Sequence, residues 1–109
     1  MSDFSNLEGL LATAKQLQME MARVKDELAR KSVSAETGGG LVKCAVDGKG
    51  DVTALEVDES LLSAENRKML QDLVVGAVNL GLERSRQMAQ EEMTKVAGGL
   101  PLPPGLFGG

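Results

Sequence analysis

Apolar residues recur near the start of the chain at alternating spacings of three and four positions. The positions are Leu7, Leu10, Ala14, Leu17, Met21, Val24 and Leu28. This heptad pattern, which no proline interrupts, predicts one long helix over residues 5–31 with an apolar seam along it. Such a helix is about 40 Å long, whereas a compact domain of this size has a radius of gyration of about 13 Å. One end should therefore project, and the seam is either a core stripe or a coiled-coil contact.

The middle of the chain changes to an alternation with a period of two. Apolar and polar side chains alternate through residues 41–47 and 51–57, and a shorter run of the same kind covers 33–37. The Asp47-Gly48 pair between the two longer runs is a strong hairpin signal. We therefore predict a three-stranded antiparallel meander.

The glycines of "ETGGGLVKCAVDGKGDV" raise the question of a phosphate-binding loop. A Walker-type loop needs glycine five positions before its Gly-Lys pair and Ser or Thr after it, but Lys43 and Gly50 stand there. A dinucleotide loop leads into a helix, whereas this pattern continues as a strand. The glycines are therefore expected at turns that need a positive φ. Cys44, the only cysteine, is expected to be a small buried strand residue.

A second long helix is predicted over residues 63–97, with Ser63 as its N-cap. Its first half is apolar on nearly every side and should lie under the sheet and against other helices. Gly76 and Gly81 suggest close packing against a neighbour, with plain tolerance of glycine as the alternative. Residues 98–109 are expected to form a flexible Gly/Pro-rich tail that is dispensable for folding. The fold class is thus α+β, in a single domain of residues 1–97 whose two helices outrun a small sheet. A homodimer with projecting helical arms would cover the apolar stripes and sheet edges.

The amino-acid composition limits the kinds of catalytic and binding sites that the chain can form. The 109 residues include no histidine, tryptophan or tyrosine, so the usual neutral-pH base and a base-stacking platform are both missing. We predict no catalytic residue, no metal site and no cofactor. The lack of a long apolar run, a signal peptide or a cysteine pair predicts a cytoplasmic protein without a membrane span. The net charge of −4 lies in residues 32–62, with two basic and six acidic side chains, whereas both flanks are neutral.

Several stretches together resemble the YbaB/EbfC nucleoid-associated proteins of bacteria. They are "GGGLVKCAVDGKGDVTALEVDESLL", "LQDLVVGAVNLGLERS", the ending "GGLPLPPGLF" and, in the first helix, "KQLQMEM". The resemblance covers essentially the whole chain. It implies a homodimer whose paired sheets form a base and whose helices project like the arms of tweezers. It also implies binding to double-stranded DNA at the nucleoid, in the bacterial cytoplasm, with little sequence specificity and without enzymatic activity.

The resemblance places the candidate DNA contacts among the basic residues of the two long helices. They are Lys15, Arg23, Lys25, Arg30, Lys31, Arg84, Arg86 and Lys95. At 100° per residue, Lys15, Arg23 and Arg30 fall within about 80° of one another, on the side opposite the seam. An outward basic stripe is expected there.

Acidic residues share these helix faces. Glu91 lies beside Arg84 and Lys95, and Glu20 and Lys25 occupy heptad positions that can pair between helices. From the residues alone, a solvated helix face is therefore a second interpretation of the basic stripe. The corresponding alternative function is a protein-interaction module or adaptor for replication or repair proteins. In that alternative the seam and the Pro-rich tail make the contacts, and DNA affinity is incidental.

Overall fold

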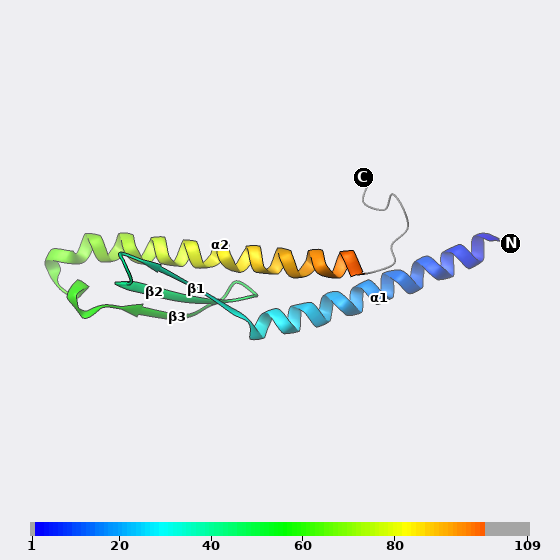
Figure 1. Ribbon diagram of the computed structural model, residues 1–109, viewed down its shortest axis with the longest axis horizontal. Coiled ribbons are helices and arrows are strands. Elements are labelled where there is room, and N and C mark those ends of the chain that lie inside the picture. The colour runs from blue at the N-terminus through cyan, green and yellow to red at the C-terminus, as the bar shows by residue number, and fades with distance from the viewer. Residues whose placement is uncertain (1, 100–109) are drawn as a thin grey trace.

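The computed structural model describes residues 2–99, with the side chains of residues 6–98. Helix α1 (Ser2–Arg30) leads into strands β1 (Ser32–Thr37), β2 (Val42–Asp47) and β3 (Val52–Val57), and the chain then enters helix α2 (Arg67–Gly99). The molecule is a rod with extents of 77 × 26 × 16 Å, and its radius of gyration of 21.0 Å far exceeds that of a compact domain. Figure 1 shows α2 along the whole body and α1 continuing past its end. The predicted α+β order and the projecting helix are confirmed.

The strands form an antiparallel meander in the order β1-β2-β3, as the alternation predicts. Cys44 of the central strand is paired with Ala35 on one side and with Leu55 on the other. The register of β2 with β3 shifts between Ala45 and Val46, which is a bulge that the sequence pattern did not reveal. Helix α2 covers one face of β1 and β2, and β3 remains a bare edge strand.

The core lies between α2 and the central strand. Its fully buried members are Val42, Cys44, Val46, Leu61 and Ala77. Cys44 is 2% exposed, and its burial raises the pKa of the thiol, so the expectation of a buried strand cysteine is confirmed. Apolar side chains of α2 and the flanking strands complete this core.

Close packing explains one of the two helix glycines. A Cβ placed on Gly81 would lie 2.7 Å from the Val46 methyl carbon Cγ2, so only glycine lets α2 approach β2 here. A Cβ on Gly76 would meet the Thr37 methyl at 3.4 Å, which is tight but not prohibitive.

The glycines between β1 and β2 have the expected positive φ, with values from 63° to 99°, and Gly50 has a φ of 91°. The expectation is wrong for Gly48, whose φ is not positive; glycine is needed there because a Cβ would lie 2.8 Å from the Leu28 Cα.

The start of α2 differs from the prediction. Ser63 makes no side-chain capping hydrogen bond, and it precedes a short 3₁₀ turn, Ala64–Asn66, rather than the long helix. An earlier turn, Glu59–Leu61, brings Leu61 into the core at 2% exposure. The chain therefore needs two tight turns to anchor Leu61 before α2 begins at Arg67. The prediction of Ser63 as the N-cap of the second long helix is wrong for this reason.

The first half of α2 is not enclosed on every side, contrary to expectation. Val75 is 60% exposed and Met69 is 50% exposed, because the sheet covers only one face of the helix. No second helix lies on the opposite side within the described residues. An apolar flank of α2 is therefore open beside the bare edge of the sheet.

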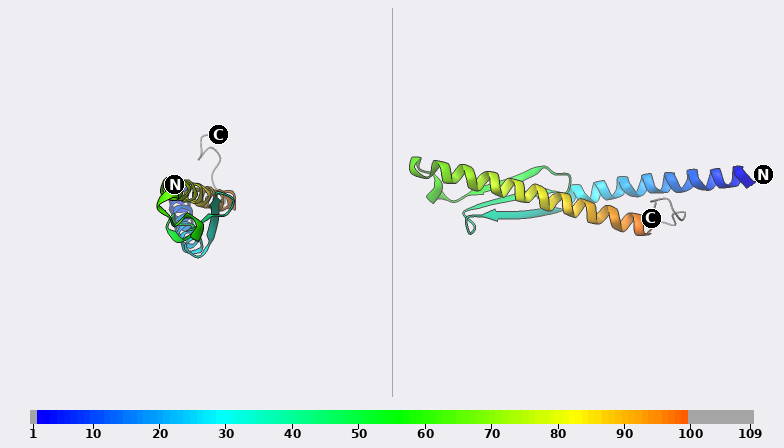
Figure 2. Two further views of the ribbon diagram at one scale, coloured as in Figure 1. Left: turned by 90° about the vertical axis from the view of Figure 1, so that its left-hand side faces the viewer. Right: turned by 90° about the horizontal axis from the view of Figure 1, so that it is seen from above.

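The base of α1 is fixed by the turn between β2 and β3. The backbone N–H of Gly48 donates to the carbonyl oxygens of Leu28 and Lys31, and a Cβ on Gly48 would collide with Leu28. The Ser85 hydroxyl donates a 2.7 Å hydrogen bond to the carbonyl of Asp47, which ties the same turn to α2. Three elements therefore meet at one junction, from which α1 projects (Figure 2).

The seam of α1 changes environment along its length. Val24 and Leu28, near the junction, are 1% and 4% exposed, whereas Leu7 and Leu10, near the far end, are 53% and 51% exposed. The seam is thus a core stripe at its base and a bare stripe on the projecting part. Within the single chain, Glu20 binds Arg23 of its own helix.

Candidate nucleic-acid interface

The outward face of α1 carries three of the candidate cations. Lys15, Arg23 and Arg30 are all exposed, and they lie on the side opposite Val24 and Leu28, which pack toward the body. This is the placement that the helical spacing predicts. The heptad seam therefore turns a basic stripe toward solvent along an arm that is free of the sheet.

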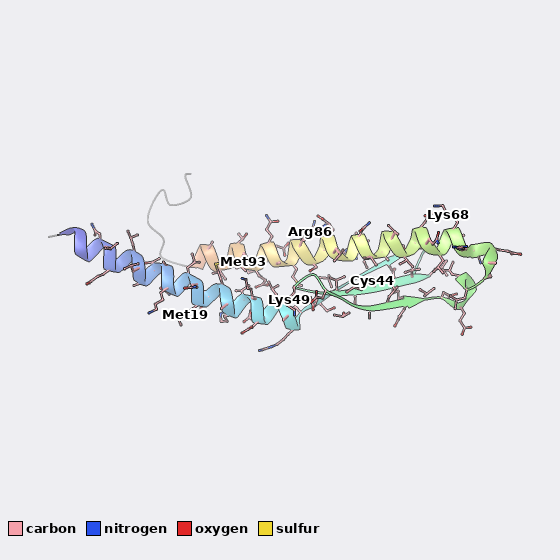
Figure 3. The ribbon with its side chains drawn as sticks, turned by 180° about the vertical axis from the view of Figure 1, so that it is seen from behind. Met19, Cys44, Lys49, Lys68, Arg86 and Met93 are labelled. Atoms are coloured by element: carbon pink, nitrogen blue, oxygen red, sulfur yellow. The ribbon has the colours of Figure 1, made fainter. Side chains whose placement is uncertain are left out.

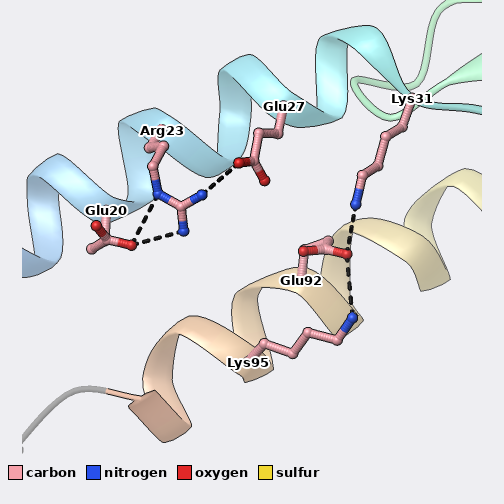
Figure 4. Close-up of polar contacts among 6 residues, drawn as sticks. All are labelled: Glu20, Arg23, Glu27, Lys31, Glu92 and Lys95. Carbon is pink, nitrogen blue, oxygen red and sulfur yellow. Dashed lines mark hydrogen bonds and ion pairs between the residues drawn. The ribbon is translucent and has the colours of Figure 1, made fainter.

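Arg23 is bound on its own helix by two carboxylates (Figure 4). Its guanidinium lies 2.8 Å from Glu20 and 2.5 Å from Glu27. The hydrogen bond and charge of Glu20, followed by the charge of Glu27, raise the pKa of Arg23 above its usual value. An anion that approaches Arg23 must displace these partners. Arg23 is thus a weaker candidate than its position alone suggests.

Lys31 and Lys95 share one carboxylate at the junction of the helices. Lys31 Nζ lies 2.9 Å from Glu92 Oε1, and Lys95 Nζ lies 3.5 Å from the same oxygen (Figure 4). The Glu92 side chain is only 17% exposed. The hydrogen bond from Lys31 is the main cause that lowers the pKa of Glu92, with further contributions from the charges of both lysines. This cluster links α1 to α2 and holds two candidate cations in place.

Two further candidates on α2 also have partners. Arg84 donates from Nη1 to the carbonyl oxygen of Ser34 in β1 at 2.7 Å, so it braces the helix against the sheet. Arg86 lies 2.9 Å from Glu83, one turn earlier. Figure 3 shows Arg86 on the outer side of α2, between Lys68 near its start and Met93 in its second half. Arg84 has a structural role, and Arg86 is an exposed, paired cation.

Three candidates are free of such pairs. Lys15, Lys25 and Arg30 are exposed and have no acidic partner among the side chains of residues 6–98. All three lie on α1. The structure thus divides the eight predicted residues into three available cations on the arm and five that already bind a carboxylate or a carbonyl.

Basic residues outside the arms lie in acidic surroundings. Lys49 is 3.7 Å from Asp51 at the tip of the β2–β3 turn, and Lys68 is 3.0 Å from Asp72 at the start of α2.

The described residues contain no cluster of three or more potential metal ligands. In the same part of the chain, neither long helix is apolar enough over a sufficient length to cross a bilayer.

Sequence reasoning missed the residue that organises the junction. Glu91 was expected beside Arg84 and Lys95, but the carboxylate that binds Lys95 is Glu92, and Arg84 turns to the sheet. The signal was present as an i,i+3 spacing between Glu92 and Lys95. The rotation of α2 against α1 brings Lys31 to the same oxygen, and the spacing does not predict this rotation.

The sequence profile described as the YbaB/EbfC DNA-binding family matches residues 3–100 of this chain. A nucleoid-associated protein of Syntrophobacter fumaroxidans is 50% identical over 97 residues, covering 85% of this chain and 88% of the relative. A nucleoid-associated protein of Bradyrhizobium diazoefficiens is 41% identical and covers 99% of both chains. The crystal structure of an uncharacterized protein from Helicobacter pylori has the same fold, with a TM-score of 0.73 and 25% identity. That alignment covers 87% of this chain and 97% of the other.

Proposed function

Because the chain belongs to the YbaB/EbfC DNA-binding family, we propose that it binds double-stranded DNA as a homodimer through basic residues on projecting helices. The observation that carries this proposal is the arm itself. Helix α1 extends past the end of α2 and presents Lys15, Lys25 and Arg30 without acidic partners among the described side chains. The protein acts as a non-enzymatic component of the nucleoid in the cytoplasm, as the names of its relatives suggest.

The homodimer is supported by a continuous apolar surface at the edge of the sheet. On β3, Val52 and Leu55 are each 44% exposed, although both are apolar strand residues. At 100° per residue, Val75, Val78 and Leu82 fall within about 60° of one another on α2. That flank lies opposite the one that touches the end of β1, so it is turned toward β3.

A second copy of the chain is a suitable cover for this surface. Strand β3 has unpaired backbone groups along its outer edge, and an apolar strand edge of this kind pairs readily with another chain. A two-fold axis beside β3 would bury both apolar surfaces at once, because the same patch meets itself. The two sheets then form the base of the dimer, and the two α1 helices are its arms.

The proposed mode of binding is electrostatic. Exposed lysine and arginine side chains neutralise phosphates and release counterions, and this contributes affinity without reading the bases. No aromatic ring that could stack on a base occurs among residues 6–98, whose side chains the structure describes. Low sequence specificity follows. With many of the candidate cations already paired to carboxylates, the affinity should be modest and sensitive to salt.

The alternative, an adaptor for replication or repair proteins, is favoured by a different observation. Leu7, Leu10 and Leu11 lie on one side of α1 and are each more than half exposed. Such a surface fits a helix-in-groove contact with another protein. In that case the cations beside it would only improve solubility.

Gel shifts with duplexes of unrelated sequence, across a salt series, distinguish the two functions. The protein used should first be shown by light scattering to have twice the 11.5 kDa chain mass. Similar affinity for each duplex and a steep decline with salt are expected, with about −0.9 in the slope of log affinity against log salt for each neutralised phosphate. Binding that hardly responds to salt, or no binding at low salt, would favour the adaptor.

A further inference from the structure

The bare part of the α1 seam begins where α2 ends. Helix α2 covers the seam at Val24 and Leu28, and the exposure of the seam rises to 38% at Met21 and to more than half at Leu10. Figures 1 and 2 both show α2 ending beside α1 while α1 continues. The cover of the seam therefore stops where α2 stops.

A groove marks the same part of α1. It has a volume of about 430 Å³. Its lining residues are Ala14, Leu17, Gln18, Met21, Ala22 and Lys25. The side chains of Ala14 and Ala22 are small beside those of Leu17 and Met21, and this difference leaves space for an extended segment.

The next residues of the chain have a suitable composition for this groove. Residues 100–109, "LPLPPGLFGG", lie outside the described residues and follow directly from the end of α2. They carry four large apolar side chains, namely Leu100, Leu102, Leu106 and Phe107. Prolines favour an extended polyproline conformation, and they reduce the entropy that an extended segment loses when it is bound.

Their length is also suitable. Ten residues in an extended polyproline conformation reach about 31 Å. The seam from Met21 to Leu7 is 14 residues of helix and spans about 21 Å. A tail that leaves Gly99 toward the N-terminal end of α1 is therefore long enough to pass through the groove and cover the bare seam as far as Leu7.

We propose that residues 100–109 bind along the bare seam of α1 in the same chain, continuing the cover that α2 provides over Val24 and Leu28. The tail then acts as a strap that stabilises the projecting arm. The sequence-based expectation of a dispensable tail concerns residues outside the described part of the chain, and this proposal is an alternative to it. The inference does not depend on DNA binding, because it concerns only how the arm is supported.

Disulfide trapping tests the contact directly. In a Cys44→Ala background, Leu10→Cys combined with Gly105→Cys should oxidise readily to an intramolecular disulfide, seen as a faster monomer band. The matched control pairs Gly105→Cys with Ala12→Cys, which is exposed on the opposite side of the same turn. Trapping at Leu10 but not at Ala12 is expected. Equal trapping at both positions would overturn the proposal, and so would trapping that appears only as a covalent dimer, which would assign the seam to a second copy.

Hydrogen exchange provides a test with the native cysteine in place. In the full chain, amides of residues 7–17 should exchange roughly tenfold more slowly than in a variant that ends at Gly99. A full-length variant with Leu102→Asp and Leu106→Asp should exchange like the truncated chain, which excludes an effect of length alone. Amides of β2 serve as an internal reference and should not change. Identical exchange of residues 7–17 in all three proteins would overturn the proposal.

Discussion

Lys31 and Glu92 lie 2.9 Å apart across the junction of the two long helices, although 61 positions separate them in the sequence. The same oxygen of Glu92 also holds Lys95 at 3.5 Å. One carboxylate therefore occupies two of the cations proposed to bind phosphate. Glu92 therefore stabilises the junction, and in the proposed function it also competes with DNA for both lysines.

The variant Glu92→Gln should bind DNA more tightly and with a steeper salt dependence. The substitution keeps the shape of the side chain but frees two cations per chain, and each additional neutralised phosphate contributes about −0.9 to the slope of log affinity against log salt. Gel shifts across a salt series measure both quantities. Glu65→Gln makes the same change in net charge at the opposite end of the molecule. Equal gains in the two variants would show that only net charge is responsible.

The three available cations of α1 should carry most of the DNA affinity. Replacing Lys15, Lys25 and Arg30 together with Glu should abolish binding, because these side chains have no acidic partner among the described residues. The matched control replaces Lys43, Lys49 and Lys68 with Glu, which changes the net charge equally but away from the arm. The control should bind only moderately less well in the same assay. If both triple variants lose binding to the same extent, the arm is not the interface.

The edge strand β3 should hold the proposed dimer together. Leu55 is 44% exposed in the single chain, so Leu55→Glu is compatible with the monomer fold but places a charge in the interface. Light scattering should give a mass of about one 11.5 kDa chain for this variant and of two for the parent. Leu10→Glu, on the arm, should remain dimeric. A Leu55→Glu dimer of unchanged stability would exclude β3 as the interface.

The two glycines of α2 should respond differently to alanine. At Gly76 the Cβ meets the Thr37 methyl at 3.4 Å, and the higher helix propensity of alanine, about 1 kcal/mol, should offset the crowding. At Gly81 the Cβ lies 2.7 Å from Val46 Cγ2 in the core, where overpacking costs about 1–3 kcal/mol. Gly81→Ala should thus be less stable than Gly76→Ala, as urea unfolding would show. Equal stabilities would mean that α2 shifts away from β2 without cost.

Acid should weaken the junction. Lys31 lowers the pKa of Glu92 below its ordinary value of 4.5. A depressed folded-state pKa contributes stability above the ordinary pKa, and that contribution is lost as the pH falls through the folded-state value. Thermal unfolding followed by circular dichroism should therefore show Glu92→Gln as less stable than the parent at neutral pH. The difference should disappear at pH values well below 4.5. A difference that persists in acid would have to come from packing instead of charge.

The helices and strands could be predicted because their signals are local. The heptad spacing of Leu10, Leu17 and Val24 and the alternation through β2 are each contained in a short stretch of sequence. Helix–helix rotation is not local, so the pairing of Lys31 with Glu92 could not be predicted. The start of α2 depends on burying Leu61 in a core made by distant strands, and this outweighed the capping preference of Ser63.

The turn at Gly48 holds α1 only near its C-terminal end, so most of this long helix extends beyond its point of attachment. Its backbone N–H binds the carbonyls of Leu28 and Lys31, so the direction of a 29-residue helix is decided within one turn of its end. At 1.5 Å per residue, a tilt of only about 10° at that point moves the far end of the helix by roughly 7 Å. Two such helices in a dimer would change the spacing of their tips by about twice that amount. In such a dimer, a small repacking around Gly48 would change the distance between the tips of the two α1 helices.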